Sequence, residues 1–324
     1  MRRIGKAMGF VRFLRSLSPH ALAAEAGLPH DIAIVATSEG AGRCVLEAIG
    51  GKDAVERKRE DLSLTVLPAA APRFRPAEIA IWAIDRPLGG ESGQKQMLAR
   101  LVPEARVLVV IFPASTGLLD WGSQLNRLPP NVRIELLPVT ELDAHELRGD
   151  LVPLLLRLAP DLRLALARHF PPFRDTVAHQ IILETSAANA RFAALSNLPA
   201  LIPVVGNLLA AGADLYVLTR NQIAMIYLLA VISGRDPRGG FRHLLEVFPL
   251  IGTGFFWRTV ARELAALLPF YLGAVPKILV AFVGTFVLGQ TAATYFLHGR
   301  RPEPRAVDGF YQTALEHAKS LVAR

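Results

Sequence analysis

Five short apolar runs between residues 31 and 140 constrain the fold of this chain more than any other feature. They are residues 32–36, 62–67, 79–84, 107–112 and 134–139. Helical patterns occur between these runs at 43–49 and 92–101, and after the last run at 143–158. Strands that are apolar on both faces and alternate with helices are typical of a parallel sheet covered by helices on each side. The sequence therefore predicts a three-layer α/β domain with a mostly parallel sheet over residues 31–160.

The last third of the chain is apolar and shows no strand-like alternation. Its runs without a charged residue are 192–213, 221–234, 247–257, 264–276 and 278–298, of which the first and last hold 22 and 21 residues. A bilayer needs about 20 apolar residues, so these two are long enough to span it and the other three are not. Because arginines bound the runs instead of interrupting them, we expect an all-α, partly membrane-embedded domain. A soluble bundle that buries these helices is the alternative.

These patterns divide the chain into five parts. The expected parts are a basic amphipathic arm (1–30), the α/β domain (31–160), a helical linker (161–190), the hydrophobic helical domain (191–300) and a tail helix (301–324). In the arm, Ile4, Met8, Val11 and Leu14 recur at helical spacing among five basic residues. This pattern indicates either a helix on an anionic membrane surface or a solvated terminus.

The net charge of +8 is unevenly distributed along the chain. Residues 31–186 hold 18 basic and 20 acidic residues, whereas residues 187–324 hold 13 and 7. The basic residues of the last part flank apolar runs without interleaved aromatic side chains, so we expect membrane lipids and not nucleic acid as partners. A hairpin of two crossings would leave the α/β domain and the tail in the cytoplasm, which predicts a location at the inner (cytoplasmic) membrane.

The segment 31–51, DIAIVATSEGAGRCVLEAIGG, resembles the opening of an Era-like (Ras-like) small GTPase. A working phosphate loop reads G-x-x-x-x-G-K-[ST], in which the lysine reaches the phosphates and the hydroxyl holds magnesium. Aligned on the second glycine of that motif, the vestigial loop comprises Thr37, Ser38, Gly40, Gly42, Arg43 and Cys44. Arginine stands where the lysine belongs, and a thiol is a poor magnesium ligand, so we expect the metal site to be lost.

The other motifs that the resemblance implies are absent. The γ-phosphate sensor D-x-x-G is expected after run 62–67, where the chain reads PAAA at residues 68–71. The guanine-reading N-K-x-D is expected after run 107–112, where residues 112–115 read FPAS, and Thr140 and Glu141 replace the final S-A. Because all of these motifs are lost, we expect a domain that keeps the GTPase-like fold but does not hydrolyse GTP. An unrelated α/β domain with a glycine-containing turn remains the alternative.

The apolar third resembles the uncharacterised helical domain found behind Era-like GTPases and in YcjF-type inner-membrane proteins of bacteria. The features that carry this resemblance are a proline- and glycine-broken entry, the polar step after Asp214, and a late apolar helix with two glycines. They comprise Pro199, Pro203, Gly206, Thr219, Arg220, Asn221, Gln222, Gly284 and Gly289. The family brings no established activity with it.

No other chemistry can be read from the sequence. The eight histidines include no i, i+4 pair and no H-E-x-x-H, so we predict no metal site and no catalytic residues. Cys44, the single cysteine, stands near a helix N-terminus, a setting that lowers a thiol pKa, with a buried inert cysteine as the alternative.

Together these features favour a bacterial membrane-associated pseudo-GTPase that acts as a scaffold or recruits a protein partner, with homo-oligomerisation open and no cofactor. The first alternative is a nucleotide-binding regulator that uses Arg43 to bind GTP with non-standard motifs. The second is a soluble helical adaptor.

Overall fold

A computed structural model describes seven parts of the chain, namely residues 24–56, 60–67, 77–85, 105–113, 133–195, 213–236 and 274–322. Several expectations fall outside these residues. They are most of the basic arm, the helix at 92–101, the segments 68–71 and 114–115, the broken apolar entry at 196–212, and the runs at 247–257 and 264–273. The described residues form two units, Glu25–Thr176 and the part that begins at Val177.

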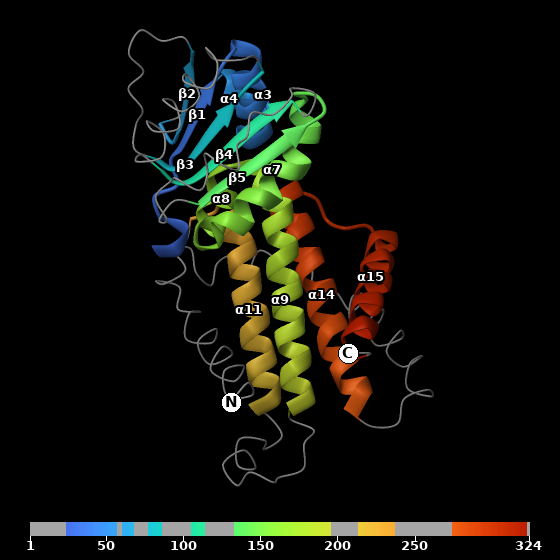
Figure 1. Ribbon diagram of the computed structural model, residues 1–324. Helices are drawn as coiled ribbons and strands as arrows, with labels where there is room; N and C mark the ends of the chain where they lie inside the picture. The colour runs from blue at the N-terminus through green and yellow to red at the C-terminus, as the bar shows by residue number, and fades with distance from the viewer. Residues whose placement is uncertain are drawn as a thin grey trace, which may run out of the picture. The chain divides into compact units, whose positions relative to one another are not determined.

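The first unit contains a five-stranded parallel sheet (Figure 1). Its strands are β1 (Ile32–Ala36), β2 (Leu62–Val66), β3 (Ala77–Ala83), β4 (Ala105–Pro113) and β5 (Arg133–Val139). All four neighbouring pairs are parallel, and the order across the sheet is β2-β1-β3-β4-β5. The predicted parallel α/β fold class is therefore confirmed, and this order is one of the common doubly wound arrangements.

The core of this unit lies along the three central strands. Every residue of β1 is buried, and so are the last five residues of β3 and Val107–Phe112 of β4. The edge strands β2 and β5 are only partly buried, and Pro138 is accommodated in β5 because an edge strand has a free side. Runs that are apolar on both faces thus became the central strands.

Two helices pack beside each other and against the sheet, α3 (Glu39–Gly50) and α7 (Ala144–Leu158). Each begins at an N-cap side chain, because the Ser38 hydroxyl accepts from the Ala41 amide and the Asp143 carboxylate accepts from two amides of the first turn of α7. The serine cap explains why α3 begins four residues earlier than its apolar pattern indicates. Short helices complete the unit: α4 (Asp53–Glu56), η2 (Pro160–Leu162), α8 (Arg163–His169) and η3 (Pro171–Phe173).

In the described residues of the second unit, all the regular elements are helices. It contains most of α9 (Arg174–Leu195), together with α11 (Ala213–Ile232), α14 (Ala274–His298) and α15 (Pro304–Val322). Helix α14 contacts both α11 and α15. Among the described residues, one helical stretch, Ile278–His298, is long and apolar enough to cross a membrane. Because 61% of its most apolar window is buried within the protein, this stretch alone is weak evidence for a membrane span.

Candidate functional site

The sheet order creates a topological switch point at the carboxyl ends of β1 and β3. The two strands that follow β1 in the chain lie on opposite sides of it, β2 on one and β3 on the other. In doubly wound sheets, ligands bind in the crevice outside the carboxyl ends at such a point. The residues that follow these two strands are Thr37 and Ser38 after β1, and Asp85 after β3.

Asp85 holds both hydroxyl groups that follow β1. The Thr37 hydroxyl donates to Asp85 Oδ1 at 2.5 Å, and the Ser38 hydroxyl donates to Oδ2. In return, the Asp85 amide donates to Thr37 Oγ1 at 2.9 Å. Ser38 is also the N-cap of α3, so the carboxylate lies beside the first turn of a 12-residue helix. A helix N-terminus attracts anions, and here the anion is the Asp85 carboxylate of the chain itself.

The vestigial loop folds differently from a phosphate cradle. Only Thr37 and Ser38 separate β1 from α3, so Gly40 and Gly42 are already helical. The Gly42 amide donates to the Ser38 carbonyl at 3.1 Å, within the helix. A Cβ on Gly42 would lie 2.6 Å from Leu64 Cδ1, whereas one on Gly40 would meet only the Ser38 hydroxyl, at 3.8 Å. The space around Gly42 therefore explains that glycine by the close packing of helix on sheet.

Arg43 and Cys44 lie further along α3. The Arg43 guanidinium pairs with the Glu39 carboxylate one turn earlier at 2.7 Å, and both side chains are more than 60% exposed. Burial raises the pKa of the Cys44 thiol to about 11, with added repulsion from Asp143 and Glu47. The thiol is therefore protonated at neutral pH, which contradicts the activated interpretation and agrees with the inert one.

Sequence reasoning missed Asp85. The GTPase resemblance placed the aspartate of D-x-x-G after the second apolar run, at residues 68–71. The structure places the third run beside the first, and the carboxylate that reaches Thr37 follows that third run. The available signal was an aspartate directly after a buried strand, since parallel neighbours end at the same edge of a sheet.

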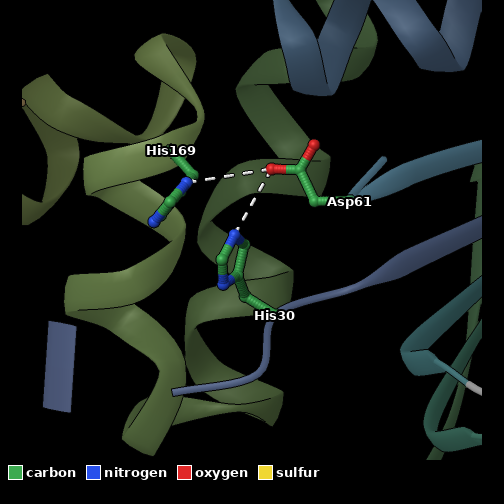
Figure 2. A group of neighbouring side chains, drawn as sticks. All are labelled: His30, Asp61 and His169. Atoms are coloured by element: carbon green, nitrogen blue, oxygen red, sulfur yellow. Dashed lines mark hydrogen bonds and ion pairs between the residues drawn. The ribbon is translucent and has the colours of Figure 1, made fainter. Parts of the chain in front are cut away.

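A second cluster of side chains gathers at the opposite, amino-terminal ends of the strands. His30 precedes β1, Asp61 precedes β2, and His169 ends α8. Figure 2 shows both imidazole rings directed at the Asp61 carboxylate, whose Oδ2 lies 3.3 Å from His30 Nε2 and 3.9 Å from His169 Nδ1. One ligand atom from each residue lies within 4.8 Å of the others, so the three form a possible metal-binding group.

This cluster could not be found by spacing, because its members are 31 and 108 positions apart in the chain. The backbone holds the first two together, since the Ile32 amide donates to the Asp61 carbonyl at 2.9 Å where β1 and β2 begin. The histidine patterns that we searched are local, whereas this group is assembled by the sheet.

Comparisons with known proteins leave the functional assignment to the geometry described above. No family model, curated protein or solved structure matches this chain.

Proposed function

We propose that this chain is a membrane-associated pseudo-GTPase, an α/β domain that does not hydrolyse GTP joined to a helical membrane domain, and that it acts as a scaffold or recruits a protein partner. The observation that carries the proposal is the position of Asp85. Its carboxylate takes the hydroxyls of Thr37 and Ser38 at the N-terminus of α3. A bound phosphate would need the same hydroxyls and would meet a like charge.

The remaining residues of the loop support the same conclusion. The Gly42 amide is committed to the helix, the Arg43 guanidinium pairs with Glu39, and a protonated Cys44 thiol offers no ligand for magnesium. A phosphate loop instead presents several free amides, a lysine and a hydroxyl to its nucleotide. The GTPase resemblance therefore concerns ancestry, and the proposed role is one of binding partners rather than of turnover.

The helical unit supports the proposed location at the inner membrane of a bacterium, with the α/β domain and the tail in the cytoplasm. The exposed fractions of Leu195, Ile223 and Val280 are 59%, 41% and 41%, and all three belong to this unit. In the first unit, Val66 is the only exposed large apolar side chain among the described residues. Apolar side chains directed outward from apolar helices suit a lipid environment, and membrane lipids are the proposed partners. An unidentified protein partner or a second copy of the chain would bind at the cytoplasmic face.

Calorimetry with GTP and with ATP, each with and without magnesium, tests the nucleotide part of the proposal. We expect no heat of binding at micromolar nucleotide for the wild-type chain. Micromolar binding that disappears in Arg43→Ala would instead establish the alternative, a nucleotide-binding regulator, which the topological switch point itself favours.

A matched pair of variants sharpens this test. Asp85→Asn removes the charge that binds the hydroxyls of Thr37 and Ser38, and we expect it to gain weak binding of inorganic phosphate. Glu39→Gln removes an equal charge from the first turn of the same helix, but this carboxylate contacts the Arg43 guanidinium and not the hydroxyls. Glu39→Gln should therefore gain nothing, and equal gains in both variants would refute the assignment of Asp85.

Fractionation tests the location. We expect the chain in the membrane pellet after a carbonate wash. Recovery in the supernatant would favour the soluble adaptor, which the burial of Ile278–His298 supports.

A further inference from the structure

We propose that His30, Asp61 and His169 bind a single zinc ion. All three belong to the α/β unit, and they lie at the end of the sheet opposite to Asp85. The ligand atoms are His30 Nε2, Asp61 Oδ2 and His169 Nδ1 (Figure 2). Two imidazoles and one carboxylate are a donor set that zinc uses, with a water molecule in the fourth position.

The first argument for a metal ion is the tautomer of His30. His30 Nδ1 lies 2.9 Å from the carbonyl oxygen of Leu28. A carbonyl only accepts hydrogen bonds, so Nδ1 carries the hydrogen and the Nε2 of a neutral ring presents its lone pair. That lone pair faces the Asp61 carboxylate at 3.3 Å. Two electron-rich atoms this close need a cation between them, either a proton or a metal ion.

His169 favours the metal ion over the proton. Its ring centroid lies 3.9 Å from that of His30, with the planes tilted by 32°. A single proton can bridge only one pair of ligand atoms, whereas one metal ion binds both rings and the carboxylate together. The carbonyl that orients His30 is also the usual outer partner of a zinc-bound imidazole.

Two of the three distances between ligand atoms lie near those around a tetrahedral ion, and the third is at most 4.8 Å. Ligand bonds of about 2.0–2.1 Å place tetrahedral ligand atoms roughly 3.3–3.4 Å apart. The pair of His30 and Asp61 is already at 3.3 Å, and the pair of His169 and Asp61, at 3.9 Å, must approach by about half an ångström. His169 ends its helix and its side chain is 35% exposed, so solvent reaches this ligand.

Burial strengthens the site. The side chains of His30 and Asp61 are 15% and 18% exposed, and the fully buried Phe170 ring stands edge-on to His30 at 6.0 Å. An apolar wall lowers the local dielectric and strengthens the attraction between the carboxylate and a cation. The ion would connect the starts of β1 and β2 to the end of α8.

Zinc affinity of the full chain, purified in detergent and stripped with a chelator, tests this proposal. Competition against a chromophoric chelator at pH 7.5 should give one zinc ion per chain. We expect Asp61→Asn and His169→Ala each to weaken binding by about a hundredfold or more, because loss of an outer partner alone costs 10–100-fold. His145→Ala is the matched control, an exposed histidine on α7, and should bind as the wild type does. Equal affinities in the wild type and in Asp61→Asn would overturn the proposal.

Two further measurements do not depend on activity. Zinc at about a hundredfold excess over its Kd should raise the Tm of the α/β unit by about 5–10 °C, and this shift should be absent in His169→Ala. Asp61→Asn keeps the backbone bond from Ile32, so it is expected to fold. X-ray absorption of the zinc-loaded wild type, which needs no variant, should show two imidazole ligands. A coordination shell without imidazole would refute the site.

Discussion

The two units of this protein differ in where their polar side chains lie along the strands and helices. In the α/β unit the polar clusters described above stand at strand ends, with Asp85 at one end of the sheet and the His30 cluster at the other. In the helical unit polar side chains lie in the middle of the helices, where Asn189, Asn221 and Thr285 are at most 1% exposed. A sheet can be apolar along its strands because the backbone of each strand is satisfied by its neighbours. Helices have no such ladder between them, so side chains set their register.

The helical network joins three helices. The Asn189 amide donates to the Thr285 hydroxyl at 2.9 Å, and the Asn221 amide donates to Asn189 Oδ1 at 2.7 Å. Gln222 also donates to Thr285, at 3.2 Å. These bonds connect α9, α11 and α14 at one level. A buried polar network has few alternative partners, so it specifies one arrangement of the helices.

Breaking that network should have the largest effect on stability. Asn189→Ala leaves the Asn221 amide and the Thr285 hydroxyl short of a partner inside the unit, at an expected cost of about 3 kcal/mol. Thr37→Val removes a buried hydroxyl, but its partner Asp85 is exposed, so water can replace part of the lost hydrogen bond, and the cost should be about 1 kcal/mol. Urea unfolding followed by circular dichroism measures both. Equal costs would contradict the contrast between the units, and exposed Thr313→Ala on α15 is the control.

The next effect concerns the packed face of α3. A thiol of pKa about 11 is almost wholly protonated at pH 8, whereas an ordinary cysteine is not. Iodoacetamide should therefore alkylate Cys44 about a hundredfold more slowly in the folded chain than in urea. Raised pH should restore the rate, because the thiolate that reacts forms as the pH approaches 11. A folded-state alkylation rate near that of the unfolded chain would show an activated thiol. Cys44 would then again be a candidate functional residue.

Close packing in the helical unit yields a third effect. A Cβ on Gly289 would lie 2.7 Å from Ile182 Cγ1 and 2.9 Å from Met225 Sδ, so three helices meet at this glycine. Gly289→Ala should cost about 1–3 kcal/mol through overpacking. Gly284, on the same helix, has nothing within 4 Å of the corresponding position, and Gly284→Ala should stabilise by about 0.5–1 kcal/mol. Thermal unfolding of the two variants provides the comparison, and a change of the same sign in both would contradict the packing around α14.

The sheet was readable from the sequence because each strand is a continuous apolar run. The predicted run at 32–36 coincides with β1, and 134–139 lies within β5. Neighbour order was not readable, because adjacency depends on the connections between strands and not on the strands themselves. The sequence therefore did not predict the contacts of Asp85 or the cluster of His30, Asp61 and His169. Both are formed by residues from elements that become neighbours only in the fold.

In the helical unit, the sequence predicted an apolar helix but not the polar contacts that the helices bury. The apolar run at 278–298 predicted α14 well, while the polar step at residues 219–222 served only as a feature of the family resemblance. Within that step Asn221 is buried and Gln222 is half-buried, and these two side chains supply the hydrogen bonds to α9 and α14. Periodicity detects an element, but it does not reveal which polar residues an element buries against its partners.

The smallest expected effect is a pH dependence of the helical unit. Partial burial lowers the pKa of His179, and the nearby His317 lowers it further. Their ring centroids are 6.3 Å apart, and both rings contact Phe286. Because the folded state holds His179 neutral, the unfolded chain takes up its proton first as the pH falls. Stability should therefore be complete above about pH 6.5 and decrease below it.

The loss should be a few tenths of a kcal/mol, because His179 is only partly buried and solvent screens its interactions. Tm values of the wild type measured between pH 7.5 and 5.5 give the slope. His179→Phe should flatten it by removing the titrating group, and His317→Phe should flatten it in part by removing the repulsion. His145→Gln, in the other unit, should leave it unchanged. A slope of the opposite sign would mean that the folded state stabilises protonated His179, and would place an acidic partner beside this ring.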